Sequence, residues 1–196
     1  MKKMSWSVLC LCALLLLSGC GRAAPPKAAD GTDWSGDWVT LGNVIAVDTP
    51  EGLTARENSD VLSAKGMYYA AWSAGEAVPY VNEDGTDAQL YDAQVYLLAA
   101  GHDSTQKAEE RAAEWLNMAY EQYAVDAEAV ETCNGQEFTV IIYTYTSETN
   151  PYTYGASAFG AYGNYALSVE LSCRESFEGD ALDTLKDFLE HCHYAT

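Results

Sequence analysis

Alternation of hydrophobic and polar positions along the chain predicts a series of β-strands. Every second residue of 165–173 is hydrophobic, as in a strand that buries one face in a core. The segment 138–145 (FTVIIYTY) is apolar on both faces, which is typical of a central strand. Together these patterns predict strands over residues 43–48, 67–73, 89–99, 125–133, 136–146 and 165–173.

In two segments the hydrophobic spacing changes to the three and four residues of an α-helix. The first runs from Asp103 to Tyr123, and Asp103 with Gln106 forms a predicted N-cap pair at its start. The second begins after Asp180, a residue type that caps helix N-termini well. Its inward positions are Leu182, Leu185, Phe188, Leu189 and Cys192.

The dipeptide Asn134-Gly135 separates two of the predicted strands. Asn-Gly between two strand-like runs is the strongest short-range signal for a two-residue β-hairpin. A hairpin among three adjacent strands that follow one long helix favours antiparallel pairing. We therefore predict an α+β fold, in which an antiparallel sheet of about six strands carries the long central helix and the C-terminal helix.

The predicted elements follow one another as strand, strand, strand, helix, strand, strand, strand, helix. This order resembles that of PsbP-like proteins, a family that includes small secreted lipoproteins, over most of residues 43–193. The resemblance implies an antiparallel sheet covered by helices. It rests on the order of elements and not on a signature motif, and the family has no shared catalytic residues to carry over, so it implies no reaction.

The first twenty residues carry an export signal. Lys2 and Lys3 precede the apolar run 8–17, which at ~1.5 Å per residue reaches about half of a ~30 Å hydrocarbon core and is too short to span it. The run leads into Leu17-Ser18-Gly19-Cys20, which resembles the lipobox of bacterial lipoproteins. The resemblance implies that the Cys20 thiol receives a diacylglycerol and that cleavage leaves Cys20 as the new N-terminus. The alternative is an ordinary secretory signal whose cleavage site ends in cysteine.

These features predict three parts: a lipoprotein signal peptide over 1–19, an acylated cysteine with a flexible spacer over 20–37, and a single acidic α+β domain over 38–196. Two or more acyl chains hold a protein on a bilayer in a way that one chain cannot. The predicted location is therefore the extracytoplasmic face of the cell membrane, with the membrane as a partner through the lipid anchor.

The composition is strongly acidic. Lys and Arg number 10 against 29 Asp and Glu, which gives a formal net charge of −19, although 48% of the residues are hydrophobic, as in folded domains. A nucleic-acid partner is disfavoured, because binding to nucleic acid depends on Lys and Arg that release counterions from the phosphate backbone. An unknown protein or a small-molecule ligand remains as the candidate partner.

Three cysteines follow the predicted anchor: Cys133, Cys173 and Cys192. Cys173 ends a strand on its apolar face, and Cys192 lies on the inward side of the last predicted helix. A Cys173–Cys192 disulfide is compatible with this placement, but we favour two reduced core thiols, because a disulfide also needs Cα atoms within about 7 Å of each other. His191 and Cys192 point about 100° apart on a helix and no zinc-site spacing is present, so neither a metal nor another cofactor is predicted.

The stretch 150–165 (NPYTYGASAFGAYGNY) is the most unusual in the domain. Its aromatic residues lie among small residues and glycines, a composition found in surfaces that bind sugars or proteins. We identify Tyr152, Tyr154, Phe159 and Tyr162 as a candidate ligand surface. The alternative is that these rings cover the end of the sheet and pack on a helix.

The sequence contains no complete catalytic constellation, and no catalytic residue is predicted. Ser104–Lys107 matches S-x-x-K but is better explained as the first turn of the long helix. The pattern therefore favours a membrane-anchored envelope lipoprotein with a non-enzymatic binding or accessory domain. The alternative is a tethered hydrolase that acts on carbohydrate or cell-wall material, for which two carboxylates would have to lie about 5 to 10 Å apart.

Overall fold

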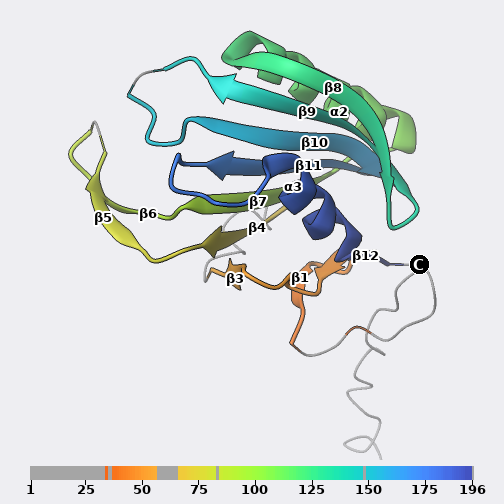
Figure 1. The fold of residues 1–196 in the computed structure, drawn as a ribbon. Helices are drawn as coiled ribbons and strands as arrows, with labels where there is room; N and C mark the ends of the chain where they lie inside the picture. The colour runs from red at the N-terminus through yellow and green to blue at the C-terminus, as the bar shows by residue number, and fades with distance from the viewer. Residues whose placement is uncertain (1–33, 35–36, 57–65, 83, 148, 196) are drawn as a thin grey trace, which may run out of the picture.

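The centre of the molecule is a seven-stranded antiparallel sheet (Figure 1). The computed structural model describes residues 34, 37–56, 66–82, 84–147 and 149–195. The sheet has the order β3-β4-β7-β11-β10-β9-β8, which confirms the α+β class but gives seven strands where about six were expected. Its strands are β3 (Thr54–Ala55), β4 (Met67–Ala74), β7 (Ala93–Gly101), β8 (Tyr123–Cys133), β9 (Gln136–Tyr145), β10 (Tyr154–Tyr162) and β11 (Tyr165–Cys173).

The predicted hairpin between β8 and β9 is confirmed. Asn134 and Gly135 both adopt positive φ angles, 47° and 76°, as the central residues of a type I′ turn require. Cys133 pairs with Gln136 directly across this turn. The right-handed twist of the strands favours this turn type, so the local sequence sets the register of the edge strand β8.

The sequence pattern missed two strands of this sheet, β3 and β10, and the strand predicted over 43–48 lies outside it, in a smaller sheet. The glycines and small residues of 150–165, which suggest a ligand surface in the sequence, serve close packing of β10 inside the sheet. A Cβ atom at Gly155 would lie 2.3 Å from the backbone oxygen of Leu171, and one at Gly160 would lie 2.7 Å from that of Glu137. These two positions therefore need glycine because neighbouring strands approach closely.

Two helices lie on opposite faces of the sheet (Figure 1). Helix α3 (Ala181–Glu190) packs on the larger core, where the ring of Phe188 meets that of Trp72 edge-on with centroids 4.8 Å apart. Helix α2 (Thr105–Gln122) covers β10 and β11 from the other side, and Phe159 lies in the smaller core beneath it. The result is a three-layer arrangement of helix, sheet and helix.

The start of α2 differs from the prediction by one residue. Ser104 is the N-cap, and its side chain accepts a hydrogen bond from the backbone of Lys107. Asp103 instead forms an exposed ion pair with Lys107 at 2.5 Å. The N-cap of α3 is Asp180, as predicted, and it accepts from the backbone of Asp183 at 2.9 Å.

Two smaller sheets complete the fold. Cys192 lies beyond α3, in β12 (Cys192–Tyr194), which pairs with β2 (Ile45–Val47); β2 also pairs with β1 (Val39–Leu41).

The strand predicted over 89–99 is broken at Tyr91 and Asp92, where the Asp92 amide donates to Ala74. Its first part is β6 (Asp87–Leu90), which forms a hairpin with β5 (Val78–Val81). Among the described residues, neither helix has the length and apolar character needed to cross a membrane.

Candidate functional site

The four aromatic residues of the predicted ligand surface do not form one surface. Tyr154 and Tyr162 point to the α3 side of β10 and Phe159 points to the α2 side, because side chains of a strand alternate between its faces. The hydroxyl of Tyr162 donates to the backbone of Ala195, and that of Tyr154 donates to Phe177. The expectation of a shared surface is therefore wrong, and the packing alternative describes these three rings.

Tyr152 precedes β10 and does line a pocket. The loop between β9 and β10 and the β5–β6 hairpin lie at the same end of the sheet (Figure 1), and a hollow of about 500 Å³ lies between them. We call it the strand-end pocket. The described residues that line it are Arg56, Tyr80, Asn82, Ala88, Gln89, Leu90, Tyr96, Ser147, Thr149, Asn150, Pro151 and Tyr152.

Tyr152 is a fixed part of the strand-end pocket. Only 6% of Tyr152 is exposed, and its backbone amide donates a hydrogen bond to the side-chain oxygen of Asn150 at 3.0 Å. Its hydroxyl oxygen lies 3.5 Å from the backbone amide of Tyr91. Burial raises the pKa of Tyr152, so the ring carries a neutral hydroxyl at physiological pH.

Arg56 brings a positive charge to the strand-end pocket. Its guanidinium lies over the ring of Tyr91, with Cζ 5.0 Å from the ring centroid, and donates to the hydroxyl of Tyr96 at 3.5 Å. Tyr96 in turn donates to Gln94 at 2.8 Å and stacks on Tyr69. Arg56 is the one charged side chain among the described residues of the wall, so the pocket combines aromatic rings, amides and a single cation.

A half-buried carboxylate, that of Glu170 on β11, lies on the same side of the sheet as α2. The hydroxyls of Tyr145 and Ser172 lie 3.1 and 3.3 Å from its Oε1, and the hydroxyl of Tyr123 also hydrogen-bonds to it. Burial raises the pKa of Glu170, and the three hydroxyl donors offset only part of that effect. Tyr143, which stacks on Tyr123 with centroids 4.1 Å apart, completes the cluster.

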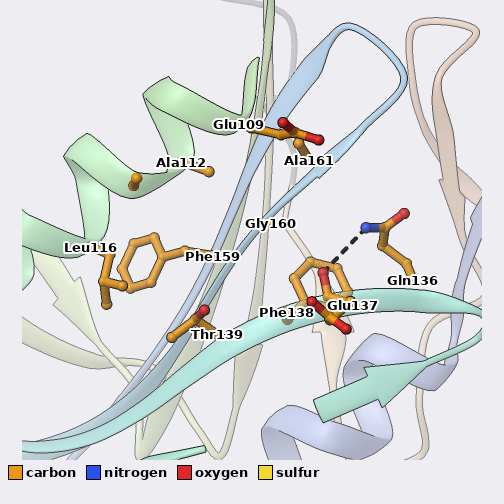
Figure 2. A pocket seen from close by; sticks show the side chains of 11 residues that line it. Glu109, Ala112, Leu116, Gln136, Glu137, Phe138, Thr139, Phe159, Gly160 and Ala161 are labelled. Atoms are coloured by element: carbon orange, nitrogen blue, oxygen red, sulfur yellow. Dashed lines mark hydrogen bonds between the residues drawn. The ribbon is translucent and has the colours of Figure 1, made fainter. Parts of the chain in front are cut away.

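A second hollow runs between the first half of α2 and the strands β9 and β10 (Figure 2). We call it the α2 crevice; its volume is about 370 Å³. Figure 2 shows the ring of Phe159 against Leu116 at its apolar end, whereas Glu109 extends from α2 toward Ala161. Glu137 is the other carboxylate of the lining, and no side-chain hydrogen bond to either carboxylate is found among the described residues.

The three cysteines of the domain are buried and free in the structure, so the Cys173–Cys192 disulfide is not formed in it. Burial raises the pKa of the Cys173 thiol to about 12, and it also raises the pKa values of Cys133 and Cys192. Within the described ranges, no group of three or more His, Cys, Asp or Glu could hold a metal ion. The predicted lipidation site, Cys20, lies outside the described residues.

Comparisons with known proteins give structural neighbours and no family. No protein-family model matches the chain, and no curated protein matches it either. The solution structure of cyanobacterial PsbP (CyanoP) from Synechocystis sp. PCC 6803 is similar at 11% identity and a TM-score of 0.38, covering 75% of this chain and 95% of that one. A crystal structure from Bacteroides thetaiotaomicron VPI-5482 has 9% identity and a TM-score of 0.38, and the match covers 80% of this chain but only 47% of that one.

Sequence reasoning found one residue of the strand-end pocket, Tyr152, and missed the others. Arg56 is the only basic residue between Lys27 and Lys65, and an isolated cation in so acidic a chain was a signal that could have been used. Tyr96 lies within the strand predicted over 89–99, on the side opposite to its buried residues. Neither pattern indicates that these residues meet Tyr152 in space.

Proposed function

We propose that this protein is a lipid-anchored, extracytoplasmic binding protein that takes a polar, hydroxyl-bearing ligand, such as a saccharide, in the strand-end pocket. The anchoring rests on the lipobox-like sequence that ends at Cys20. The binding rests on the wall of the pocket, which brings three tyrosines and three side-chain amides to one hollow at the end of the sheet. That wall is the observation that carries the proposal.

Each component of the wall suits a sugar-like ligand. Tyrosine rings give flat apolar contact for the C–H faces of a pyranose, and their hydroxyls add polar contacts. The amides of Asn82, Gln89 and Asn150 offer both donors and acceptors to ligand hydroxyls. Arg56 adds a cation, so a ligand that carries a carboxylate gains an attraction that the acidic remainder of the chain does not offer.

The ligand test uses the mature, lipid-free domain and a panel of soluble disaccharides that includes chitobiose, cellobiose and maltose. Binding is measured by saturation-transfer NMR. Substitution of Tyr80 by Ala removes a ring from the wall, and we expect it to weaken binding of a responding disaccharide by about tenfold, the equivalent of one well-packed aromatic contact.

Tyr120→Ala is the matched control, because Tyr120 is 41% exposed on α2 and does not line the strand-end pocket. Equal loss of binding in both variants, or no binding of any disaccharide to the wild type, would contradict the proposed ligand class. Release of a reducing sugar during the measurement would instead favour the hydrolase alternative.

The anchoring test compares the wild type with Cys20→Ala in a bacterial host fed labelled palmitate. We expect label in the wild type and none in the variant, which should accumulate as unprocessed precursor. Equal incorporation of label in the two proteins would refute acylation at Cys20.

A further inference from the structure

A small pocket lies beneath the second half of α2, on the flank that faces β7. Its volume is about 140 Å³. An apolar cavity of about that size holds a molecule as large as benzene. We call it the Glu170 pocket, and it is lined by Leu98, Trp115, Met118, Ala119, Gln122, Tyr123, Phe159, Ser168 and Glu170.

One carboxylate and three aromatic rings make up the chemistry of the Glu170 pocket. The rings of Trp115, Tyr123 and Phe159 come from three different elements and surround the space in front of Glu170. The ring of Trp115 already attracts a cation, because the guanidinium of Arg111 lies over it with Cζ 5.3 Å from the centroid. A carboxylate beside aromatic rings is the arrangement that recognises organic ammonium ions.

Glu170 has hydrogen-bond donors but no cationic partner among the residues that the structure describes. Tyr123, Tyr145 and Ser172 donate to its carboxylate, and all three are neutral hydroxyls. Among the described residues, the ion pairs involve other carboxylates, those of Asp103, Glu114, Glu131 and Asp187. Charges removed from water are normally paired or bound to metal, and no cation of the described residues pairs with this carboxylate.

We propose that the Glu170 pocket binds a small organic ammonium ion, with the carboxylate of Glu170 as counter-ion and the rings of Trp115, Tyr123 and Phe159 as its walls. A divalent metal does not suit the pocket, because Ca²⁺ needs six to eight oxygen ligands and the lining offers one carboxylate, one serine, one glutamine and one phenol. The chain's strong negative charge also concentrates cations at its surface. This site is separate from the strand-end pocket and does not depend on the proposed function.

The other titratable groups that face Glu170 are phenols, so Glu170 is the carboxyl group of this cluster among the described residues. They are tyrosines of four neighbouring strands: Tyr69 on β4, Tyr96 on β7, Tyr123 on β8, and Tyr143 and Tyr145 on β9. The residues that α2 contributes to the lining, Trp115, Met118, Ala119 and Gln122, carry no charge. Because a bound cation favours the ionised carboxylate, the affinity of the pocket for the cation should rise as pH rises through the raised pKa of Glu170.

The experiment is a calorimetric titration with choline, and with its neutral isostere 3,3-dimethylbutan-1-ol, at several pH values. We expect choline to bind the wild type and the neutral alcohol to bind at least about tenfold more weakly. Glu170→Gln removes the charge at nearly constant shape and should weaken choline binding by at least about tenfold. It should also remove the dependence of affinity on pH.

Glu121→Gln is the matched control, because it makes the same charge change on an exposed part of α2 outside the lining. The proposal is overturned if the wild type does not bind choline, or if the neutral alcohol binds as tightly as choline. It is also overturned if choline binding is unchanged in Glu170→Gln or is lost equally in Glu170→Gln and Glu121→Gln. If Glu170→Gln fails to fold by circular dichroism, Trp115→Leu replaces it and must weaken choline binding. Tyr80→Ala, which alters the strand-end pocket, should leave choline binding unchanged.

Discussion

We expect the stability of the domain to fall as pH rises through the pKa of Glu170, whose carboxylate has no cationic partner among the described residues. Burial raises the folded-state pKa of Glu170 above its ordinary value of about 4.3, so the folded protein holds this proton more tightly than the unfolded chain does. Between the ordinary and the raised pKa, this group lowers the free energy of unfolding as pH rises, by at most about 1.4 kcal/mol per pH unit. The tyrosines around it stay neutral over this range, because burial raises their pKa values further.

Substitution of Glu170 by Gln should remove this dependence. At pH 5 more of the wild type holds the Glu170 proton than at pH 8.5, and at the lower pH we expect the free energies of unfolding of the two proteins to lie within about 1 kcal/mol of each other. At pH 8.5 the free energy of unfolding of the variant should rise relative to that of the wild type by about 1.4 kcal/mol for each unit by which the pKa of Glu170 is raised. Urea unfolding followed by tryptophan fluorescence measures both values.

The same pair of measurements on Glu121→Gln provides the control, because Glu121 is exposed and should show no pH-dependent gain. A Glu170→Gln variant that is destabilised equally at pH 5 and pH 8.5 would refute the reasoning. It would mean that the hydroxyl donors of Tyr123, Tyr145 and Ser172 stabilise the ionised carboxylate as fully as water does.

Three further changes test the packing that positions the two pockets. Asp180→Ala removes the N-cap of α3 and should cost about 1 kcal/mol of unfolding free energy, whereas Asp180→Asn should cost much less. Phe188→Ala removes a fully buried ring that packs on Trp72 and should cost about 3 to 5 kcal/mol in urea unfolding; a loss below about 1 kcal/mol would contradict the packing of α3. Gly155→Ala places a Cβ 2.3 Å from the backbone of Leu171 and should lower the melting temperature; an unchanged temperature would contradict the tight approach of β10 and β11.

The parts of the fold that could be predicted are those determined by local sequence. The hairpin at Asn134-Gly135 follows from two residues whose backbone angles suit a type I′ turn. Strand β11 coincides with the alternating pattern of 165–173, and the N-cap of α3 coincides with Asp180. In each case, the residues that form the structure are neighbours in the chain.

The parts that were missed depend on contacts between distant segments. Strand β10 needs glycine at positions 155 and 160 because backbone oxygens of β11 and β9 lie too close for a Cβ atom there. In the sequence, such glycines cannot be distinguished from those of a loop. The strand-end pocket joins Arg56, Tyr96 and Tyr152, which lie on separate elements. The Glu170 pocket likewise forms only when α2 lies across β10 and β11.

NMR chemical shifts report ligand binding at the strand-end pocket residue by residue. The backbone amide resonances of the isotope-labelled mature domain are followed by NMR while a disaccharide from the panel is added. We expect the largest shifts on residues of the pocket wall, Tyr80, Asn82, Gln89 and Asn150 among them. Shifts that are absent from the wall and fall instead on the α2 crevice around Glu109 and Glu137, or nowhere, would contradict this expectation.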